Sequence, residues 1–200
     1  ALSPLSRQSG EAMRRALIRG VAMGDNPRTA AREMLRRVQG AFNGGLTRAL
    51  NLARTEMLDA HREATRGAMV ANADVLRGWV WMSALDTRTC PSCWAMHGTE
   101  HEVGESGPDD HQQGRCSALP LLKTWRDLGI DLDEPPSVVP DAAERFAGMS
   151  RADQLAVMGP QRLAALNDGR ATLSDMATRR TTVGWRDSWV PTPIRDLPTT

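Results

Sequence analysis

Three cysteines and one histidine in residues 90–116 constrain the fold of this chain more than any other feature. Cys90 and Cys93 are separated by two residues, and Pro91 between them favours a tight turn that points both sulfurs the same way. Seventeen residues separate Cys93 from His111, and four separate His111 from Cys116. A loop that returns to the first pair would complete a tetrahedron of three thiolates and one imidazole. The spacing therefore predicts a structural zinc site with Cys90, Cys93, His111 and Cys116 as ligands.

The same residues have two other interpretations. One is three buried, reduced thiols beside an ordinary loop histidine, with no metal. The other is a redox-active pair, which the sequence favours less because a Gly-, Asp- and Glu-rich loop follows Cys93 and no βαβ unit surrounds it. If zinc is bound, four protein ligands leave no open coordination position, so its role would be structural and not catalytic.

Composition narrows the class of protein. Two hundred residues, 40% of them hydrophobic, suffice for one sizeable domain or two small ones. The chain has no run of eighteen apolar residues and no signal-peptide pattern, so we expect a soluble protein made inside a cell, with no membrane partner. An odd number of clustered cysteines also argues against a secreted disulfide scaffold.

The net charge of +1 hides an uneven distribution of charge along the chain. Residues 1–80 carry 13 arginines against 7 acidic residues, whereas residues 81–120 carry 2 basic against 6 acidic residues. The excess positive charge of the amino-terminal region therefore favours binding to nucleic acid or to an acidic partner. The alternative is a set of solvated basic helix faces.

Hydrophobic periodicity predicts an α+β fold. Helices are expected over residues 11–21 and 26–39, followed by one long helix over residues 46–76. After Gly78 the period changes from helical to two, which predicts a strand over residues 79–84. Residues 97–120 are so rich in Gly, Pro, Asp and Glu that we expect a loop there.

The carboxy-terminal part is predicted to consist of short helices and an extended arm. Ser150 and Pro160 are helix starts, and residues 173–177 form a helical turn. These signals divide the chain into a helical basic region (1–80), a β/loop Cys-His region (81–134), a small helical segment (141–181) and an extended arm (182–200). In the arm, Trp185 and Trp189 either bind a neighbouring subunit or cover the strand that carries Trp79 and Trp81.

A series of motifs, collinear from about residue 51 to residue 120, resembles the phage Mu F-like minor head proteins, also called head morphogenesis proteins. The motifs are Ala53-Arg54-Thr55-Glu56, Gly78-x-x-Trp81-x-Ser83-x-x-Asp86, Thr89-Cys90-Pro91-x-Cys93, His97-Gly98, Pro108-x-x-His111 and Arg115-Cys116 to Pro120. With residues 46–80, the Cys-His region would form the core of such a protein. The chain departs from the family's usual His-x-x-Cys-Arg-Cys ending, because Gly114 stands at the first of those cysteine positions.

The resemblance implies a virion component present in few copies in the capsid interior near the portal vertex, made in the host cytoplasm. Its expected partner is the portal protein, with the major capsid protein and packaged DNA as further partners. It would act by binding in head assembly, DNA packaging or ejection, and not as an enzyme. Two other hypotheses are an effector or toxin-type enzyme domain and a zinc-stabilised nucleic-acid-binding module. The sequence shows no glycine-rich phosphate loop and no metalloprotease motif that would favour an enzyme.

Arg54 and Glu56 are predicted to be structural residues of the long helix. We expect both side chains to be buried or half-buried and to tie the helix to the strand around Trp81 and Asp86. A bidentate pair between Arg54 and Asp86 would be one way to do so.

Overall fold

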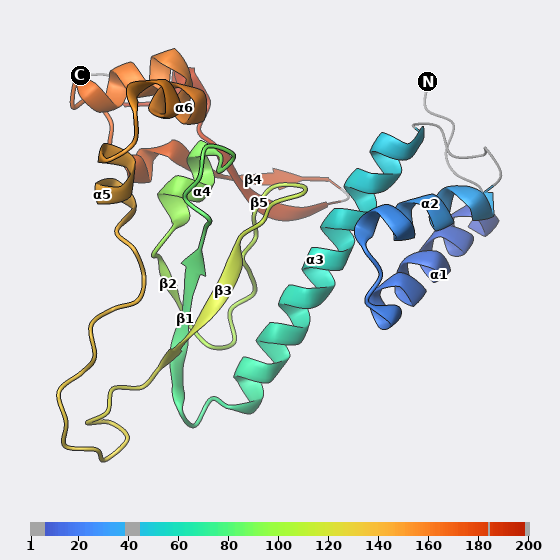
Figure 1. Cartoon of the computed structure of the whole chain (residues 1–200), viewed down its shortest axis with the longest axis horizontal. Helices are drawn as coiled ribbons and strands as arrows, with labels where there is room; N and C mark the ends of the chain where they lie inside the picture. The colour runs from blue at the N-terminus through green and yellow to red at the C-terminus, as the bar shows by residue number, and fades with distance from the viewer. Residues whose placement is uncertain (1–6, 39–44, 184, 199–200) are drawn as a thin grey trace. The chain divides into compact units, whose positions relative to one another are not determined.

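The computed structural model describes residues 7–38, 45–183 and 185–198 (Figure 1). Helices and small antiparallel sheets make up the α+β fold expected from the sequence. The chain divides into two compact units, one of residues 1–64 with 112–114 and one of residues 65–111 with 115–200. Within the described residues, no helix combines the length and the apolar character that crossing a membrane requires.

The first unit begins with two helices, α1 (Arg7–Met23) and α2 (Pro27–Val38). α1 is longer at both ends than the helix expected over residues 11–21, and α2 confirms the helix expected over residues 26–39. Gly24, with φ +67°, follows α1 in a left-handed conformation that favours glycine. The side-chain oxygen of Asn26 accepts a hydrogen bond from the N–H of Arg28 at 2.9 Å. This cap explains why α2 starts where it does.

The longest helix, α3 (Gly45–Ala71), contributes its first half to the core of this unit. Small and apolar side chains fill that core: Met13, Ala16, Ala30, Ala31, Met34, Val38, Ala49 and Ala53. The periodicity that predicted this helix places Ala60, Ala64 and Ala68 on one apolar stripe with Ala53, but all three are exposed, so the stripe is buried only in the first half. The helix also ends before residue 76, since the side-chain amide of Asn72 donates to the carbonyl of Ala68 at 2.7 Å and caps its last turn.

The second unit contains a three-stranded antiparallel sheet with the order β2-β1-β3. Its central strand is β1 (Leu76–Met82), and its edges are β2 (Glu100–His101) and β3 (Ser117–Leu122). Trp79 is in register with His101 on one side and with Pro120 on the other. The strand expected over residues 79–84 is therefore present, but it begins two residues before Gly78 and ends at Met82.

Gly78 allows β2 to approach β1. A Cβ atom added at this position would lie 2.2 Å from the carbonyl oxygen of His101, a distance that no side chain can accept. The change of periodicity at Gly78 thus marks a backbone contact within the sheet and not the boundary between helix and strand.

Three elements between β1 and the linker after β3 were not expected from the sequence. One is the short helix α4 (Pro91–Met96), which has too few residues to show a helical period. The others are β2 and β3, which lie within the region expected to be a loop. Pro120 is unfavourable inside a sheet because it has no N–H to donate, but β3 is an edge strand, where proline is tolerated.

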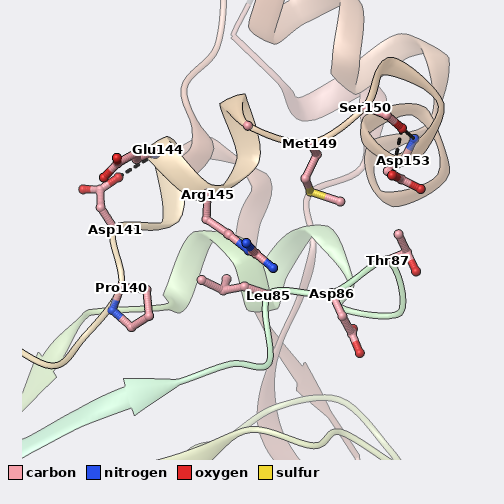
Figure 2. Close-up of a pocket in the computed structure, with 11 residues that line it drawn as sticks. Leu85, Asp86, Thr87, Pro140, Asp141, Glu144, Arg145, Met149, Ser150 and Asp153 are labelled. Atoms are coloured by element: carbon pink, nitrogen blue, oxygen red, sulfur yellow. Dashed lines mark hydrogen bonds between the residues drawn. The ribbon is translucent and has the colours of Figure 1, made fainter.

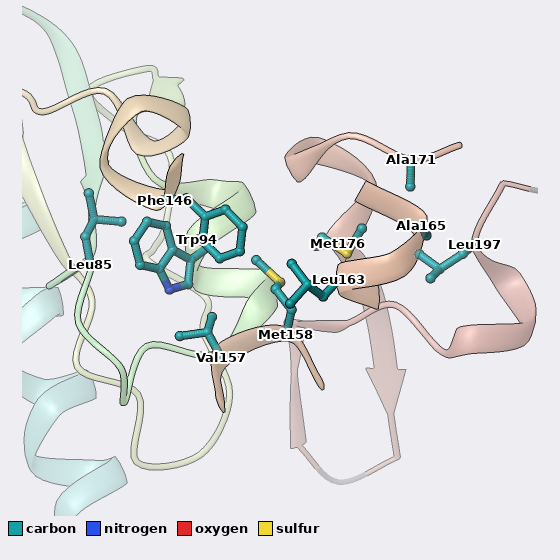
Figure 3. Close-up of a cluster of buried hydrophobic side chains, with 10 residues drawn as sticks. All are labelled: Leu85, Trp94, Phe146, Val157, Met158, Leu163, Ala165, Ala171, Met176 and Leu197. Carbon is teal, nitrogen blue, oxygen red and sulfur yellow. The ribbon is translucent and has the colours of Figure 1, made fainter. Parts of the chain in front are cut away.

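Short helices and their apolar core follow, as Figure 3 shows. They are α5 (Ala142–Ala147), α6 (Arg151–Asn167) and the 3₁₀ helix η1 (Leu173–Met176), and Trp94 meets Phe146 edge-to-face at 5.4 Å between ring centroids. Ser150 caps α6 as expected, accepting the N–H of Asp153. Gly159, with φ 72°, interrupts α6 where the sequence predicted a break.

The carboxy-terminal region is a β-hairpin and not an extended arm. β4 (Ala177–Thr182) pairs with β5 (Trp185–Pro191), and a short 3₁₀ turn, η2 (Ile194–Asp196), follows. The prediction of an arm from residue 182 is wrong because the prolines begin only at the last residue of β5. The N–H groups of residues 185–190 are therefore available for pairing with β4.

Candidate metal centre

The first two cysteines lie at the start of α4. Cys90 precedes the helix with extended backbone angles, Pro91 occupies the first turn, and Cys93 lies within the helix with 4% of its surface exposed. Since proline has no N–H to lose and a fixed φ, it favours a helix start at this position. The Cys-x2-Cys spacing therefore places both sulfurs at one end of a six-residue helix.

The loop before β3 brings the remaining donors to this point. The ligand atoms of Cys90, Cys93 and His111 all lie within 4.8 Å of one another. A second group of ligand atoms, those of Cys93, Asp110 and Cys116, meets the same limit. Cys93 belongs to both groups, so the structure gathers the four residues singled out by their spacing around one buried sulfur.

This arrangement fits a tetrahedral metal site. In such a site, donors about 2.0–2.3 Å from a zinc ion lie roughly 3.5–3.8 Å from each other. Within each of the two groups, atoms that lie within 4.8 Å of one another need only small side-chain movements to reach these distances. Cys116 shares its group with Cys93 and Asp110 and not with Cys90 or His111, so one four-ligand site requires Cys116 to approach those two residues. Thiolate and imidazole are also the donors that zinc prefers.

Asp110 is the member of the cluster that the sequence did not reveal. Its side chain is fully buried, and its Oδ2 accepts the backbone N–H of Cys116 at 3.2 Å. An aspartate next to His111 in an acidic loop looks like any solvated residue of that loop. Only the folded chain shows that this carboxylate is enclosed.

Hydrogen bonds within the cluster shift the pKa values of the thiols in opposite directions. The pKa of Cys90 is lowered by its hydrogen bond with Cys93 and then by the nearby imidazole of His111. The pKa of Cys116 is lowered by Cys93 and by Ser83, against the effects of burial and of the Asp110 carboxylate. The pKa of Cys93 is raised, because its thiol donates to Cys116 and Cys90. These surroundings favour the thiolate, the form that binds metals, more at Cys90 and Cys116 than at Cys93.

Ser83 holds the centre of the cluster from the end of β1. Its hydroxyl donates to the carbonyl of Cys93 at 2.7 Å and lies 3.3 Å from the sulfur of Cys116. Its N–H donates to Nδ1 of His97 at 3.0 Å. The residue thus links α4 to the start of β3.

Asp86 closes the turn that leads to Cys90. Its carboxylate accepts hydrogen bonds from the hydroxyl of Thr89 at 2.9 Å, from the backbone N–H of Arg88 at 3.0 Å and from the guanidinium of Arg115. The Arg115 guanidinium, followed by Thr89 and Arg88, holds the pKa of Asp86 well below its usual range.

Trp81 and Trp79 enclose the cluster from β1. They are 1% and 0% exposed and pack with Met96, Cys93 and Cys116 in one apolar group. Such a wall excludes water and lowers the local polarity, which strengthens electrostatic interactions inside it.

Two histidines near the cluster have other roles. His97 accepts from Ser83 through Nδ1, so its Nε2 carries the hydrogen and donates to the carbonyl of Pro140 at 3.0 Å. His101 stacks on Trp79 with ring centroids 4.1 Å apart, and its ring nitrogens contact Thr99 and Glu105. Both rings are used in hydrogen bonds that fix the loop, and neither belongs to the groups of potential metal ligands found among the described residues.

The predicted roles of Arg54 and Glu56 have different outcomes. Arg54 is exposed, so the expectation of a buried or half-buried side chain is wrong for this residue, whereas Glu56 is half-buried. The guanidinium groups that lie against Asp86 are those of Arg115 and Arg88. These two arginines lie closer to Asp86 along the chain than Arg54 does, and the turn at residues 86–89 orients the carboxylate towards them.

Trp189 packs within its own chain. Its side chain is partly buried against the apolar group that contains Trp79 and Trp81, as the second of the two interpretations of the tail predicted. The side chain of Trp185 lies outside the described residues. Binding of these tryptophans to a neighbouring subunit stays a prediction.

An open pocket of about 660 Å³ lies beside Asp86 (Figure 2). Its carboxylates serve local structure: Asp141 accepts the backbone N–H of Glu144 at 2.7 Å, and Asp153 accepts the hydroxyl of Ser150 at 2.8 Å. Both carboxylates are therefore used at the starts of α5 and α6, and neither adds a metal ligand or reactive group to the Cys/His cluster.

The long helix, the antiparallel sheet and the Cys/His cluster together define an α+β protein organised around a candidate structural metal centre. A family model described as phage Mu protein F like protein matches residues 11–119, which is more than half of the chain and includes all four predicted ligands. The chain therefore belongs to the phage Mu F-like family. No curated protein and no solved structure matches it.

Membership of this family indicates a phage head-morphogenesis protein and a component of the virion. The matched residues extend further towards the amino terminus than the resemblance seen from about residue 51, and so include most of α1 and all of α2. The match ends within β3, before the short helices and the hairpin.

Proposed function

We propose that this protein is a minor component of the phage head that acts by binding at the portal vertex during head assembly, DNA packaging or ejection. The family match over residues 11–119 carries this proposal. The expected principal partner is the portal protein, with the major capsid protein and packaged DNA as further partners. The protein would be made in the host cytoplasm and end in the capsid interior.

The basic helices of the first unit supply a surface for an acidic partner. All eight arginines of α1 and α2 are exposed: Arg7, Arg14, Arg15, Arg19, Arg28, Arg32, Arg36 and Arg37. Three of them have an acidic partner on the same helix, since Arg36 and Arg37 pair with Glu33 at 2.8 and 2.7 Å and Arg7 lies 3.5 Å from Glu11. A cluster of exposed guanidinium groups attracts DNA phosphates or the carboxylates of a protein surface. This contact would weaken as salt increases.

The metal that this proposal includes is a structural zinc ion held by Cys90, Cys93, His111 and Cys116. Four protein ligands would leave no coordination position for water or substrate, so the ion would stabilise the loop and not catalyse a reaction. Its binding energy would add to the folding free energy of the second unit. In keeping with this role, we propose that the protein is not an enzyme.

Purified phage particles provide the test of portal association. Particles are disrupted gently, portal rings are isolated, and the chain is detected in the ring fraction. We expect the wild-type chain to accompany the rings at a few copies per ring. Its recovery only with shells that lack the portal would overturn the proposal.

The contribution of the basic helices is tested with a triple variant, Arg14→Gln, Arg15→Gln and Arg19→Gln. We expect weaker binding to isolated portal rings or to duplex DNA, measured at two salt concentrations. The control is the double variant Glu33→Gln/Arg36→Gln, which removes one charge of each sign and leaves the net charge of α2 unchanged. Equal binding by both variants would exclude the basic helices as the contact surface.

A further inference from the structure

The carboxy-terminal hairpin, which lies outside the family match, holds the loop that carries two donors of the cluster. The backbone N–H of Trp189 donates to the carbonyl of Asp109 at 2.8 Å. Arg179 donates to the carboxylate of Asp109 at 3.3 Å. Arg186 donates to the carbonyl of Asp110 at 2.9 Å, and its Nη2 lies 3.6 Å from Oδ1 of the same residue. Three residues of β4 and β5 thus contact the two residues before His111.

Asp110 connects the hairpin to the Cys/His cluster. One of its carboxylate oxygens faces Arg186, and the other accepts the N–H of Cys116. Its ligand atom also lies within 4.8 Å of the sulfurs of Cys93 and Cys116. A continuous path therefore runs from Arg186 through Asp110 to Cys116.

The charges at the proposed metal centre explain what Arg186 would contribute to it. A zinc ion with three thiolates and one imidazole carries a net charge of about −1, and the Asp110 carboxylate adds a further negative charge in the same buried space. The Asp110 side chain is 0% exposed, so water does not neutralise it, whereas the Arg186 side chain is 26% exposed and lies against it. An arginine at this position offsets the negative charge and fixes the carboxylate.

We propose that Arg186 and Asp110 form an outer-sphere ion pair that positions Cys116 for the metal. Through this pair the carboxy-terminal hairpin contributes to metal binding. This inference rests on the structural metal of the proposed function. Asp110 acts as a positioning residue through the N–H of Cys116, and Arg186 acts through Asp110. Outer-sphere partners of this kind change metal affinity by about 10–100-fold when they are removed.

The test compares Zn²⁺ affinity and Co²⁺ absorption spectra of full-length variants. Arg186→Gln removes the positive charge, Asp110→Asn removes the negative charge but keeps an acceptor oxygen, and Arg186→Lys restores the charge. Arg180→Gln is the matched control, since Arg180 is an exposed arginine of the same hairpin. Zn²⁺ affinity is measured by competition with a chromophoric chelator, and circular dichroism checks that each variant is folded.

We expect Arg186→Gln to weaken Zn²⁺ binding by about tenfold, with Arg186→Lys recovering part of the loss and Arg180→Gln matching wild type. The double variant Arg186→Gln/Asp110→Asn should lose less affinity than the product of the two single losses, because the two residues act as a pair. The thiolate-to-Co²⁺ charge-transfer bands should keep their intensity in all of them.

Three results are distinguishable from this expectation. A wild-type chain that binds neither Zn²⁺ nor Co²⁺ would overturn the metal centre itself. Tight binding that is equal in Arg186→Gln and Arg180→Gln would overturn the outer-sphere pair and leave the metal centre standing. A changed Co²⁺ ligand-field spectrum in Asp110→Asn would show that Asp110 is itself a ligand, which also overturns the proposal.

Discussion

The guanidinium of Arg115 lies against both carboxylate oxygens of Asp86, with Nη2–Oδ1 and Nη1–Oδ2 distances of 2.7 and 3.1 Å. This bidentate pair joins the turn that precedes Cys90 to the residue that precedes Cys116. The two halves of the cluster are therefore held together by a charge-assisted contact outside it.

Replacing Asp86 by Asn should destabilise the protein by about 1 kcal/mol at neutral pH, because the side chains of the pair are 33% and 41% exposed and solvent screens them. The lowered pKa of Asp86 means that its contribution is present above the ordinary value of 3.8 and is lost as pH falls through the lowered value. Asp86→Asn should therefore show a smaller loss of stability on acidification. Urea unfolding at several pH values measures this difference.

The matched control for that experiment is Glu100→Gln, which removes the pair between Arg77 and Glu100 on the sheet. Its side chains are more exposed, at 47% and 54%, so we expect a smaller effect. Equal losses in the two variants would contradict a special role for Asp86.

Replacing Cys90 by Ser should unfold residues 87–120 if zinc is bound, because the metal then supplies folding free energy to that loop. Elemental analysis of the purified protein measures the zinc content, and hydrogen exchange measures protection of the loop. A chelator should reproduce the effect in the wild type and add nothing to the variant. With a metal-free thiol cluster, no zinc would be found and the substitution would be milder.

Stability should decrease as pH falls below about 6.5 because of His97. Burial lowers the pKa of His97 in the folded state, so between that lowered value and 6.5 the unfolded chain binds more protons than the folded one. His97→Gln should flatten this part of the profile, as measured by thermal unfolding between pH 5 and 8. An unchanged slope in His97→Gln would contradict this assignment.

Gly78→Ala should be destabilising by about 1–3 kcal/mol or more, since the new methyl group would meet the carbonyl oxygen of His101 at 2.2 Å. Gly67→Ala is the control, because its methyl group on α3 would meet no heavy atom within 4 Å. That change should stabilise the protein by roughly 1 kcal/mol through helix propensity. Chemical denaturation compares the two, and an unaffected Gly78→Ala variant would refute the close approach.

Deleting residues 182–200 should lower the melting temperature, because it removes β5 and the packing of Trp189. Trp189→Ala should cost about 2 kcal/mol, less than a fully buried tryptophan, and Val183→Ala in the exposed turn should be neutral. Incorporation of the truncated chain into particles is measured in parallel. Normal stability with loss of incorporation would show instead that the tail is an interaction element.

The sequence predicted features that depend on local chemistry. The Ser150 cap and the break at Gly159 could be recognised because their signals lie within a few residues. The spacing of the cysteines likewise indicated the cluster. Asp110 could not be recognised, because its burial depends on Arg186 and on the hairpin more than seventy residues later. Pro120 concealed β3 for a similar reason, since only the sheet order shows that this strand is an edge.

The two edges of the three-stranded sheet limit how this sheet can pair with strands of other chains. One edge, β2, is two residues long, and the other, β3, contains Pro120, which offers no N–H to an incoming strand. Neither edge is a good template for another chain. The three-stranded sheet is thereby protected from pairing strand to strand with another chain.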